Sequence, residues 1–169
     1  MVYSLVHYPV IEMERIDRFR RNYDPQFGLI RPHITIMFPL TESISEDKLV
    51  DHLQNILSEI EPFPIHLRGL QKSVDDYLFL LVDQGKEDIV DLHMRVYSEL
   101  LENRRRSSLR YVPHLTLGDF SNKLDEYPQA LAEAKQLDLN YRCMLDRLDL
   151  LKLNDEPRQI VWSKQFEIG

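Results

Sequence analysis

The stretches Pro32-His33-Ile34-Thr35-Ile36 and Pro113-His114-Leu115-Thr116-Leu117 are two copies of one short pattern. Their histidines lie 81 residues apart, from 33 to 114, in a chain of 169 residues. A pattern of this length that recurs with only isoleucine–leucine exchanges is uncommon. Its recurrence at half-chain spacing predicts two related lobes, with one copy of the motif in each.

Each copy begins a predicted strand and follows a predicted helix after a short loop. In the first copy, His33 and Thr35 share one face of the strand and Ile34 and Ile36 share the other; the second copy repeats this arrangement. The aliphatic face is suited to packing on helices. The His/Thr face must meet water, a ligand or a polar partner, because buried polar groups need hydrogen-bond partners.

The remainder of the chain alternates between helical and strand patterns. Apolar spacing predicts helices over 12–23, 45–60, 89–101 and 124–137, the last interrupted at Pro128. β-Branched and aromatic runs predict strands over 3–10, 34–40, 65–70, 77–82, 114–120, 141–153 and 159–168. This order predicts an α+β or α/β fold, and no linker-like stretch divides residues 1–169 into independent domains.

Composition disfavours several classes of partner. A formal net charge of −7 argues against binding to double-stranded DNA, because neutralising its phosphates needs a dense basic surface. A local pocket can still hold a small anion or a nucleic-acid end. The first ten residues do not have the pattern of a signal peptide, and no apolar run approaches the roughly 20 residues of a membrane span. We therefore expect a cytoplasmic protein without membrane association.

Metal and cofactor signatures are missing from the sequence. Cys143 is the only cysteine, so neither an internal disulfide nor a thiolate metal site is expected, and we interpret it as a buried small residue. His52 and His93 fall in predicted helices, where we expect partial exposure. With no H-E-x-x-H spacing and no glycine-rich phosphate loop, we expect no metal and no cofactor.

The paired residue types suit the cleavage of a phosphodiester. That reaction needs a base for the attacking oxygen and an acid for the leaving oxygen, and histidine can fill either role near neutral pH. His33 and His114 are therefore the candidate catalytic residues. Thr35 and Thr116 are candidate phosphate-binding residues, because their hydroxyls can donate to non-bridging oxygens. Gly118, on the same predicted face, would let a ligand approach the backbone closely.

A purely structural role for these histidines is the competing interpretation. For either copy alone it is the better one, since hydrogen-bonded strand histidines are common. For the pair, with proline and threonine reproduced, a functional role is favoured.

The paired His-x-Thr segments resemble the signatures of the 2H phosphoesterase superfamily, which includes 2′–5′ RNA ligase-like proteins and cyclic phosphodiesterases. The segment from Pro32 to Leu40 is similar to the first motif of that family and its trailing strand. The resemblance implies a bilobal, pseudo-twofold α+β fold, with mixed or antiparallel sheets flanked by helices and a central cleft. It also implies metal-independent chemistry on a cyclic or 2′–5′ phosphodiester of a nucleotide or RNA end.

One residue departs from the family pattern. Many relatives carry a basic residue shortly after the second motif, where this chain has Asp119. A carboxylate beside a phosphate is unfavourable unless it points away or orients another group. The departure bears more on an RNA-processing substrate than on the site itself.

Several residues near the motifs are candidates for substrate binding. Arg31 precedes the first motif, and Arg110 and Tyr111 precede the second. Arg110 follows the run 104–106, whose arginines could instead be cations placed favourably at a helix C-terminus. Tyr77, Tyr111 and Phe38 could stack on a base, although core packing is the better interpretation of Phe38.

Three hypotheses for function follow. The first is an enzyme that cleaves cyclic or 2′–5′ phosphodiesters, with His33 and His114 as acid and base in an order that the sequence does not fix. The second is a non-catalytic module that binds a nucleotide or RNA end in the same cleft, which Asp119 motivates. The third is a protein-interaction domain with a vestigial cleft.

Overall fold

The computed structural model describes residues 1–40, 44–105, 110–154 and 159–169. The described strands are β1 (Val2–His7), β2 (Ile34–Leu40), β3 (Phe63–Lys72), β4 (Tyr77–Val82), β5 (His114–Asp119), β6 (Asn140–Leu145), β7 (Arg147–Leu153) and β8 (Ile160–Glu167). The α-helices are α1 (Glu14–Tyr23), α2 (Glu46–Leu57), α3 (Lys86–Val96) and α4 (Tyr127–Gln136). Two short 3₁₀ helices, η1 (Glu99–Arg104) and η2 (Leu124–Glu126), accompany them.

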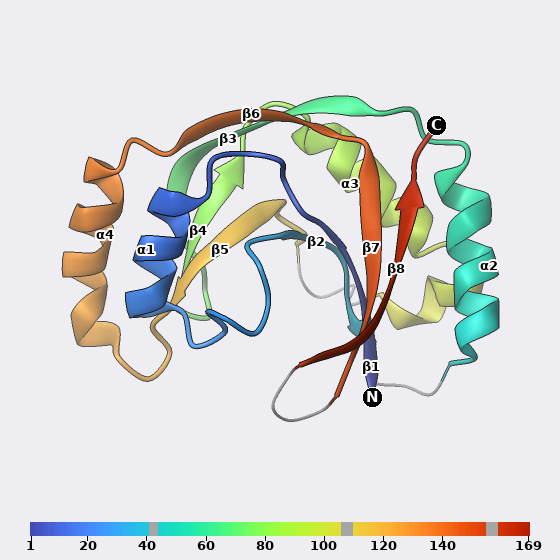
Figure 1. Ribbon diagram of the computed structural model, residues 1–169, viewed down its shortest axis with the longest axis horizontal. Coiled ribbons are helices and arrows are strands. Elements are labelled where there is room, and N and C mark those ends of the chain that lie inside the picture. The colour runs from blue at the N-terminus through green and yellow to red at the C-terminus, as the bar shows by residue number, and fades with distance from the viewer. Residues whose placement is uncertain (41–43, 106–109, 155–158) are drawn as a thin grey trace.

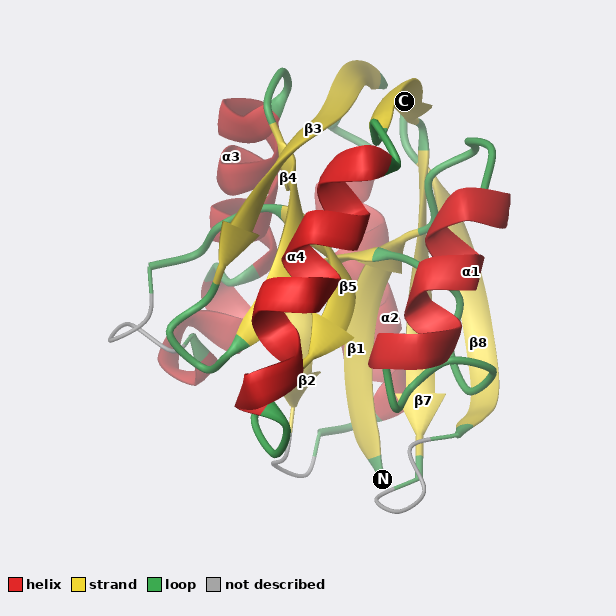
Figure 2. Cartoon of the chain, turned by 90° about the vertical axis from the view of Figure 1, so that its left-hand side faces the viewer, coloured by secondary structure: helices red, strands yellow, loops and turns green. Residues whose placement is uncertain are grey.

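All eight strands belong to a single curled sheet in the order β6-β3-β4-β5-β2-β1-β7-β8 (Figure 1). Every pairing between them is antiparallel. Helices α1 and α4 lie together at one end of the molecule, and α2 and α3 lie at the other (Figure 1). Figure 2 shows α1 and α4 in front of the sheet. The predicted α+β class is confirmed, with an antiparallel sheet flanked by helices.

Two strand–helix–strand units meet at the middle of the sheet. One consists of β1, α1 and β2, the other of β4, α3 and β5, and each ends on a strand that carries a motif copy. Strands β2 and β5 are neighbours through one residue pair, Ile34 with Leu115. Each helix packs across this junction, α1 against β5 and α3 against β2. The repeat seen in the sequence therefore corresponds to two strand–helix–strand units, and the helix of each unit packs against the motif strand of the other.

Some predicted boundaries were wrong. The strand predicted over 141–153 is two strands that separate at Asp146, because β6 pairs with β3 whereas β7 pairs with β1 and β8. The helix predicted over 89–101 ends at Val96 and is followed by η1. Pro128 does not interrupt α4; it lies in its first turn, where a missing backbone N–H costs no helical hydrogen bond.

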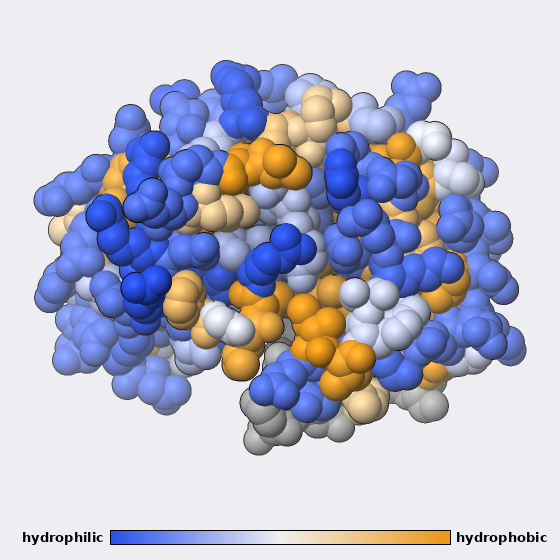
Figure 3. Space-filling view, viewed as in Figure 1, coloured by the Kyte–Doolittle hydropathy of each residue, from blue (hydrophilic) through white to orange (hydrophobic). Residues whose placement is uncertain are grey.

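The aliphatic motif residues lie in the core, as predicted. Ile34, Ile36, Leu115 and Leu117 are fully buried. On the face shown in Figure 3, hydrophobic side chains gather near the middle, between hydrophilic flanks. No helix in the described part of the chain is long and apolar enough to cross a membrane.

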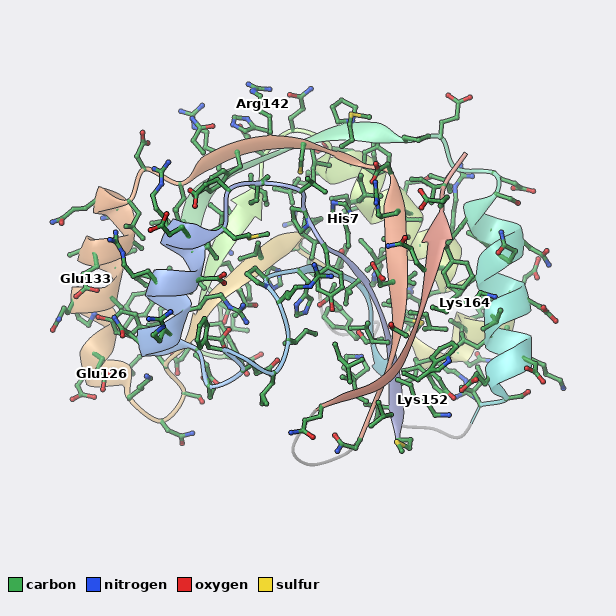
Figure 4. All side chains as sticks on the ribbon, in the orientation of Figure 1. His7, Glu126, Glu133, Arg142, Lys152 and Lys164 are labelled. Atoms are coloured by element: carbon green, nitrogen blue, oxygen red, sulfur yellow. The ribbon has the colours of Figure 1, made fainter. Side chains whose placement is uncertain are left out.

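The prediction that His52 and His93 are partly exposed was wrong. Both are buried, and each ring hydrogen-bonds a backbone carbonyl: His52 Nε2 lies 3.0 Å from Val96 O, and His93 Nδ1 lies 2.7 Å from Ile36 O. Each histidine is three or four residues from buried apolar residues of its helix, so it shares their face. His7 is also buried, near the middle of the molecule (Figure 4).

A buried ion pair shapes the segment that leads to the first motif. Arg20 Nε, on α1, donates to Asp24 Oδ2 at 2.7 Å, and both side chains are almost completely buried. Arg20 Nη2 also donates to Ile30 O at 3.0 Å, and Asp24 Oδ1 accepts from Gln26 N. These bonds tie both ends of the 24–30 loop to α1, just before His33.

Replacing Arg20 by leucine should destabilise the protein strongly. The substitution leaves the Asp24 carboxylate buried without its charge partner, which typically costs about 3–5 kcal/mol. Urea unfolding followed by circular dichroism measures the change. Arg18→Leu, at an exposed position of the same helix, should change the free energy of unfolding by no more than about 0.5 kcal/mol. Equal effects of the two substitutions would show that the buried pair does not hold this loop.

Candidate active site

The two motif copies meet where β2 and β5 pair. Because Ile34 lies opposite Leu115 in an antiparallel register, His33 comes next to Thr116, and Thr35 next to His114. The two aliphatic residues face the core, so the four polar side chains share the opposite side of the sheet. The structure thus brings together the residues that the sequence marked as candidate catalytic and phosphate-binding groups.

Both imidazoles are held by the same local hydrogen bond. His33 Nδ1 lies 2.8 Å from Arg31 O, and His114 Nδ1 lies 2.6 Å from Val112 O, in each case the carbonyl two residues earlier. A carbonyl only accepts, so each ring carries its proton on Nδ1 and presents the lone pair of Nε2. Within the described ranges, neither Nε2 has a hydrogen-bond partner. Both nitrogens are therefore available to a substrate.

The two threonine hydroxyls are also available. Thr35 and Thr116 are half-buried, and neither side chain hydrogen-bonds another residue that the structure describes. A hydroxyl can donate to an anionic oxygen. Two imidazoles and two hydroxyls therefore surround one patch at the β2–β5 junction, which is a suitable donor and acceptor set for a phosphate.

Burial sets the protonation of the two imidazoles. Desolvation lowers the pKa of His33, and it lowers the pKa of His114 to about 4, while the backbone hydrogen bonds act in the opposite direction. The charge of His33 further lowers the pKa of His114, because two cations close together repel. Both rings are consequently neutral at pH 7 in the free protein, and each can accept a proton at Nε2.

The two imidazoles differ in their surroundings, which nothing in the sequence indicated. Phe79, on β4, stacks on His114 with ring centroids 3.5 Å apart and planes inclined by 17°. His33 instead meets the edge of Tyr8 at 6.2 Å. Buried and half-buried residues alternate along β4, and Phe79 is half-buried. Its position beside His114 depends on the pairing of β4 with β5, which the sequence pattern does not show.

The three candidate substrate-binding residues lie on different sides of the site. Arg31 covers the ring of Tyr8, at 4.1 Å from its centroid, and so lies beside His33. Tyr111 donates a hydrogen bond from its hydroxyl to Thr35 O at 2.7 Å, and its ring stacks on His93 at 3.9 Å. Arg110 lines a cavity beside α3 together with Tyr111. Of the run 104–106, residue 106 lies outside the described residues.

Asp119 is turned toward its own loop. Its Oδ1 accepts a hydrogen bond from Ser121 N at 2.9 Å, at the far end of β5 from His114. The carboxylate thus orders a turn and points away from His114. In this arrangement it does not oppose a phosphate bound at the site.

The expectation for Gly118 was wrong. A Cβ at this position would lie 2.8 Å from a ring carbon of Phe120 and 3.0 Å from Tyr23 Cβ. The missing side chain makes room for these two core residues, not for a ligand.

Other reactive groups stand apart from this patch. Cys143 is only partly buried, and burial raises the pKa of its thiol to about 11, so it is protonated at neutral pH. Nowhere in the described segments do three histidine, cysteine or carboxylate side chains cluster as metal ligands would. Asp75 and Asp76 lie in the β3–β4 turn.

Removing the ring of Phe79 should raise the pKa of His114. Phe79→Ala opens one face of the imidazole to water, which relieves desolvation and moves the pKa from about 4 toward the ordinary value of about 6.5. An NMR pH titration of the His114 ring protons measures it. Tyr77→Ala is the control, because Tyr77 stacks on Phe79 at 6.3 Å and not on the imidazole. A pKa of His114 that stays the same in Phe79→Ala would refute this assignment.

Comparisons with known proteins agree with the geometry. The sequence profile of the 2′-5′ RNA ligase superfamily matches residues 8–157. A Bacillus licheniformis protein that is provisionally named a phosphoesterase is 28% identical over 169 residues, covering 96% of each chain. A Bacillus mycoides protein with the same provisional name is 29% identical over 142 residues, covering 82% of this chain and 80% of its own.

Solved structures share the fold at low sequence identity. The TT0787 protein of Thermus thermophilus superposes with a TM-score of 0.66 at 14% identity, covering 99% of this chain and 98% of its own. Escherichia coli LigT in complex with NADP+ gives 0.62 at 15% identity, covering 99% and 97%. Because the superfamily profile spans most of the chain and includes both motif copies, the chain belongs to the 2′-5′ RNA ligase superfamily.

Proposed function

We propose that this protein is a phosphoesterase that cleaves a cyclic 2′,3′ or a 2′–5′ phosphodiester at the end of a nucleotide or RNA, with His33 and His114 as acid and base and without a metal ion. One observation carries the proposal. Two imidazoles with equivalent Nδ1 bonds and open Nε2 atoms flank a patch that the hydroxyls of Thr35 and Thr116 complete.

The reaction can be written with these four groups. One neutral imidazole takes a proton from the attacking water or hydroxyl at Nε2, while the other, protonated, gives its proton to the leaving oxygen, which is 2′ or 3′ for a cyclic phosphate and 5′ when a hydroxyl attacks a 2′–5′ linkage. The bond from the attacking oxygen to phosphorus forms as the bond to the leaving oxygen breaks. Thr35 and Thr116 donate to the non-bridging oxygens, where negative charge is held. The two imidazoles exchange roles when the reaction runs in reverse.

The negative charge of the substrate would allow one of the two imidazoles to become protonated. Both imidazoles are neutral near pH 7 because burial lowers their pKa values. An anionic phosphate between them raises the pKa of each, because an opposite charge favours the protonated form. Binding of the phosphodiester would therefore protonate one ring, and the repulsion between the two would keep the other neutral.

The relatives support this class of substrate. LigT has been solved with 3′-AMP and with ATP, at TM-scores of 0.57 and 0.54 to this chain. Several Bacillus relatives bear provisional phosphoesterase names. The feature that motivated a binding-only module, Asp119, has its carboxylate bonded within its own turn, so it gives that alternative no further support.

Loss of either imidazole should lower kcat strongly. His33→Ala and His114→Ala each remove an acid–base group, which is worth about 10²- to 10⁴-fold in kcat. The assay follows cleavage of a 2′,3′-cyclic nucleotide and of a 2′–5′ dinucleotide by the purified protein in EDTA. His66→Gln is the control, because His66 bonds Asn140 Oδ1 on β6 and lies outside the patch.

Three outcomes distinguish the hypotheses. A kcat within about tenfold of the wild-type value in both alanine variants would contradict the roles given to the imidazoles. Tight nucleotide binding with no turnover in the wild type would favour the non-catalytic module. Loss of activity on adding EDTA, restored by a divalent cation, would contradict the metal-independent mechanism.

A further inference from the structure

We infer that Tyr111 and His93 are positioning residues: they hold a β-bulge directly after Thr35 and so orient the Thr35 hydroxyl toward the phosphate. This inference rests on the proposed function and adds to it two residues that act through Thr35. Both motif copies contain such a bulge, but only the one on β2 is bonded by these side chains.

Strand β2 has one extra residue directly after its motif threonine. Thr35 pairs with Val6 of β1. The next residue along β1, Leu5, lies opposite Met37. Ile36, between the two paired residues of β2, therefore has no counterpart on β1, which defines a β-bulge.

Strand β5 repeats this irregularity at the same position of its motif. Thr116 pairs with Phe79 of β4. The next residue along β4, Leu78, lies opposite Gly118, so Leu117 is the extra residue. Bulges occur often next to active sites, where they change the direction of a side chain. Two bulges in equivalent places therefore point to a role in orienting the two threonines.

The bulges end the polar face of each motif strand. In an uninterrupted strand, Met37 would share the face of Thr35, and Gly118 would share that of Thr116. Both are instead buried, like the extra residue before each of them. The extra residue reverses the alternation, so only one His/Thr pair from each strand faces the site. It also increases the local twist, which sets the direction of the threonine beside it.

Two side chains bond the backbone of the bulge on β2. The Tyr111 hydroxyl donates to Thr35 O at 2.7 Å, and His93 Nδ1 lies 2.7 Å from Ile36 O. The carbonyls on both sides of the bulge are thus held. Within the described residues, no side chain bonds the corresponding carbonyls of Thr116 and Leu117. This support is therefore specific to the first motif copy.

Burial keeps both side chains in the donor form. Desolvation lowers the pKa of His93, so its ring is neutral at pH 7. Its proton is on Nδ1, because the carbonyl of Ile36 only accepts. Burial raises the pKa of Tyr111, so its hydroxyl also keeps its proton. The two rings stack with centroids 3.9 Å apart and planes inclined by 6°, so each restrains the other.

Both donors come from the other strand–helix–strand unit. His93 lies on α3, and Tyr111 precedes β5, whereas the bulge that they bond is on β2. Tyr111 is followed three residues later by His114. Its bond to Thr35 O therefore fixes a threonine of one copy relative to the histidine of the other. A displacement of about 1 Å at such a site can lower the rate by about 10²-fold.

A double-mutant cycle between Tyr111 and Thr35 tests this role. Tyr111→Phe keeps the ring stacked on His93 but removes the donor to Thr35 O. It should lower kcat for a 2′,3′-cyclic nucleotide about tenfold, with KM within about twofold, because a misplaced group that acts in the transition state lowers kcat. In a Thr35→Val background, which has no hydroxyl to orient, the same substitution should lower kcat by less than about twofold.

Two substitutions of His93 separate its hydrogen bond from its packing. His93→Leu removes the donor and should lower kcat about as much as Tyr111→Phe. His93→Asn places an amide nitrogen as many bonds from Cα as Nδ1, so it can still donate to Ile36 O and should recover most of the loss. An imidazole that only fills space would not show this recovery.

Tyr3→Phe is the matched control. The Tyr3 hydroxyl is also bonded in the same sheet, to Glu46 Oε2 at 2.7 Å, but Tyr3 lies opposite Leu40, away from Thr35. This variant should keep kcat within about twofold of the wild type. An unchanged kcat in Tyr111→Phe, an equal fold loss with and without the Thr35 hydroxyl, or a kcat of His93→Asn no higher than that of His93→Leu would overturn the inference while the proposed function stands.

Phosphate affinity separates a failure of this inference from a failure of the proposed function. Should the wild type cleave neither a cyclic nucleotide nor a 2′–5′ dinucleotide, the proposed function fails, and the four proteins of the cycle are compared by their dissociation constants for inorganic phosphate. Weaker binding in Tyr111→Phe that disappears in the Thr35→Val background would support the inference. Equal weakening in both backgrounds, or no phosphate binding by the wild type, would overturn it.

Discussion

The site depends on a single backbone contact, the pairing of Ile34 on β2 with Leu115 on β5. This pair joins the two strand–helix–strand units, and its antiparallel register places each histidine beside the threonine of the other copy. Beyond this pair, side chains bond the next backbone carbonyls of β2. Tyr111 bonds Thr35 O, and His93 bonds Ile36 O. A shift of one residue would turn the polar side chains toward the core. The buried aliphatic residues on the opposite face therefore fix the geometry of the candidate active site.

The two copies are related in backbone but not in environment. The same Nδ1 bond to the carbonyl two residues earlier orients both imidazoles, whereas Phe79 covers one face of His114 and Tyr8 meets His33 edge-on. An approximate twofold arrangement can thus hold a symmetrical phosphate while distinguishing the two groups attached to it.

The sequence predicted what local periodicity can encode and missed what depends on distant partners. Alternation in the motif copies correctly assigned the buried face of each strand, because Ile34 and Leu115 are apolar and their neighbours polar. The break at Asp146 was missed, since no glycine or proline marks it and only the change of partner strand defines it. The burial of His93 follows from its place four residues after Ile89, but its carbonyl partner on β2 could not be foreseen.

The central claim is that both imidazoles face one shared phosphate, and NMR of the histidine side-chain nitrogens tests it directly. Titration of ¹⁵N-labelled protein with inorganic phosphate should shift the Nε2 resonances of His33 and His114 together, with one dissociation constant, while the buried His52 and His66 stay unchanged. Shifts at only one of the two rings, or at two different phosphate concentrations, would contradict a common site.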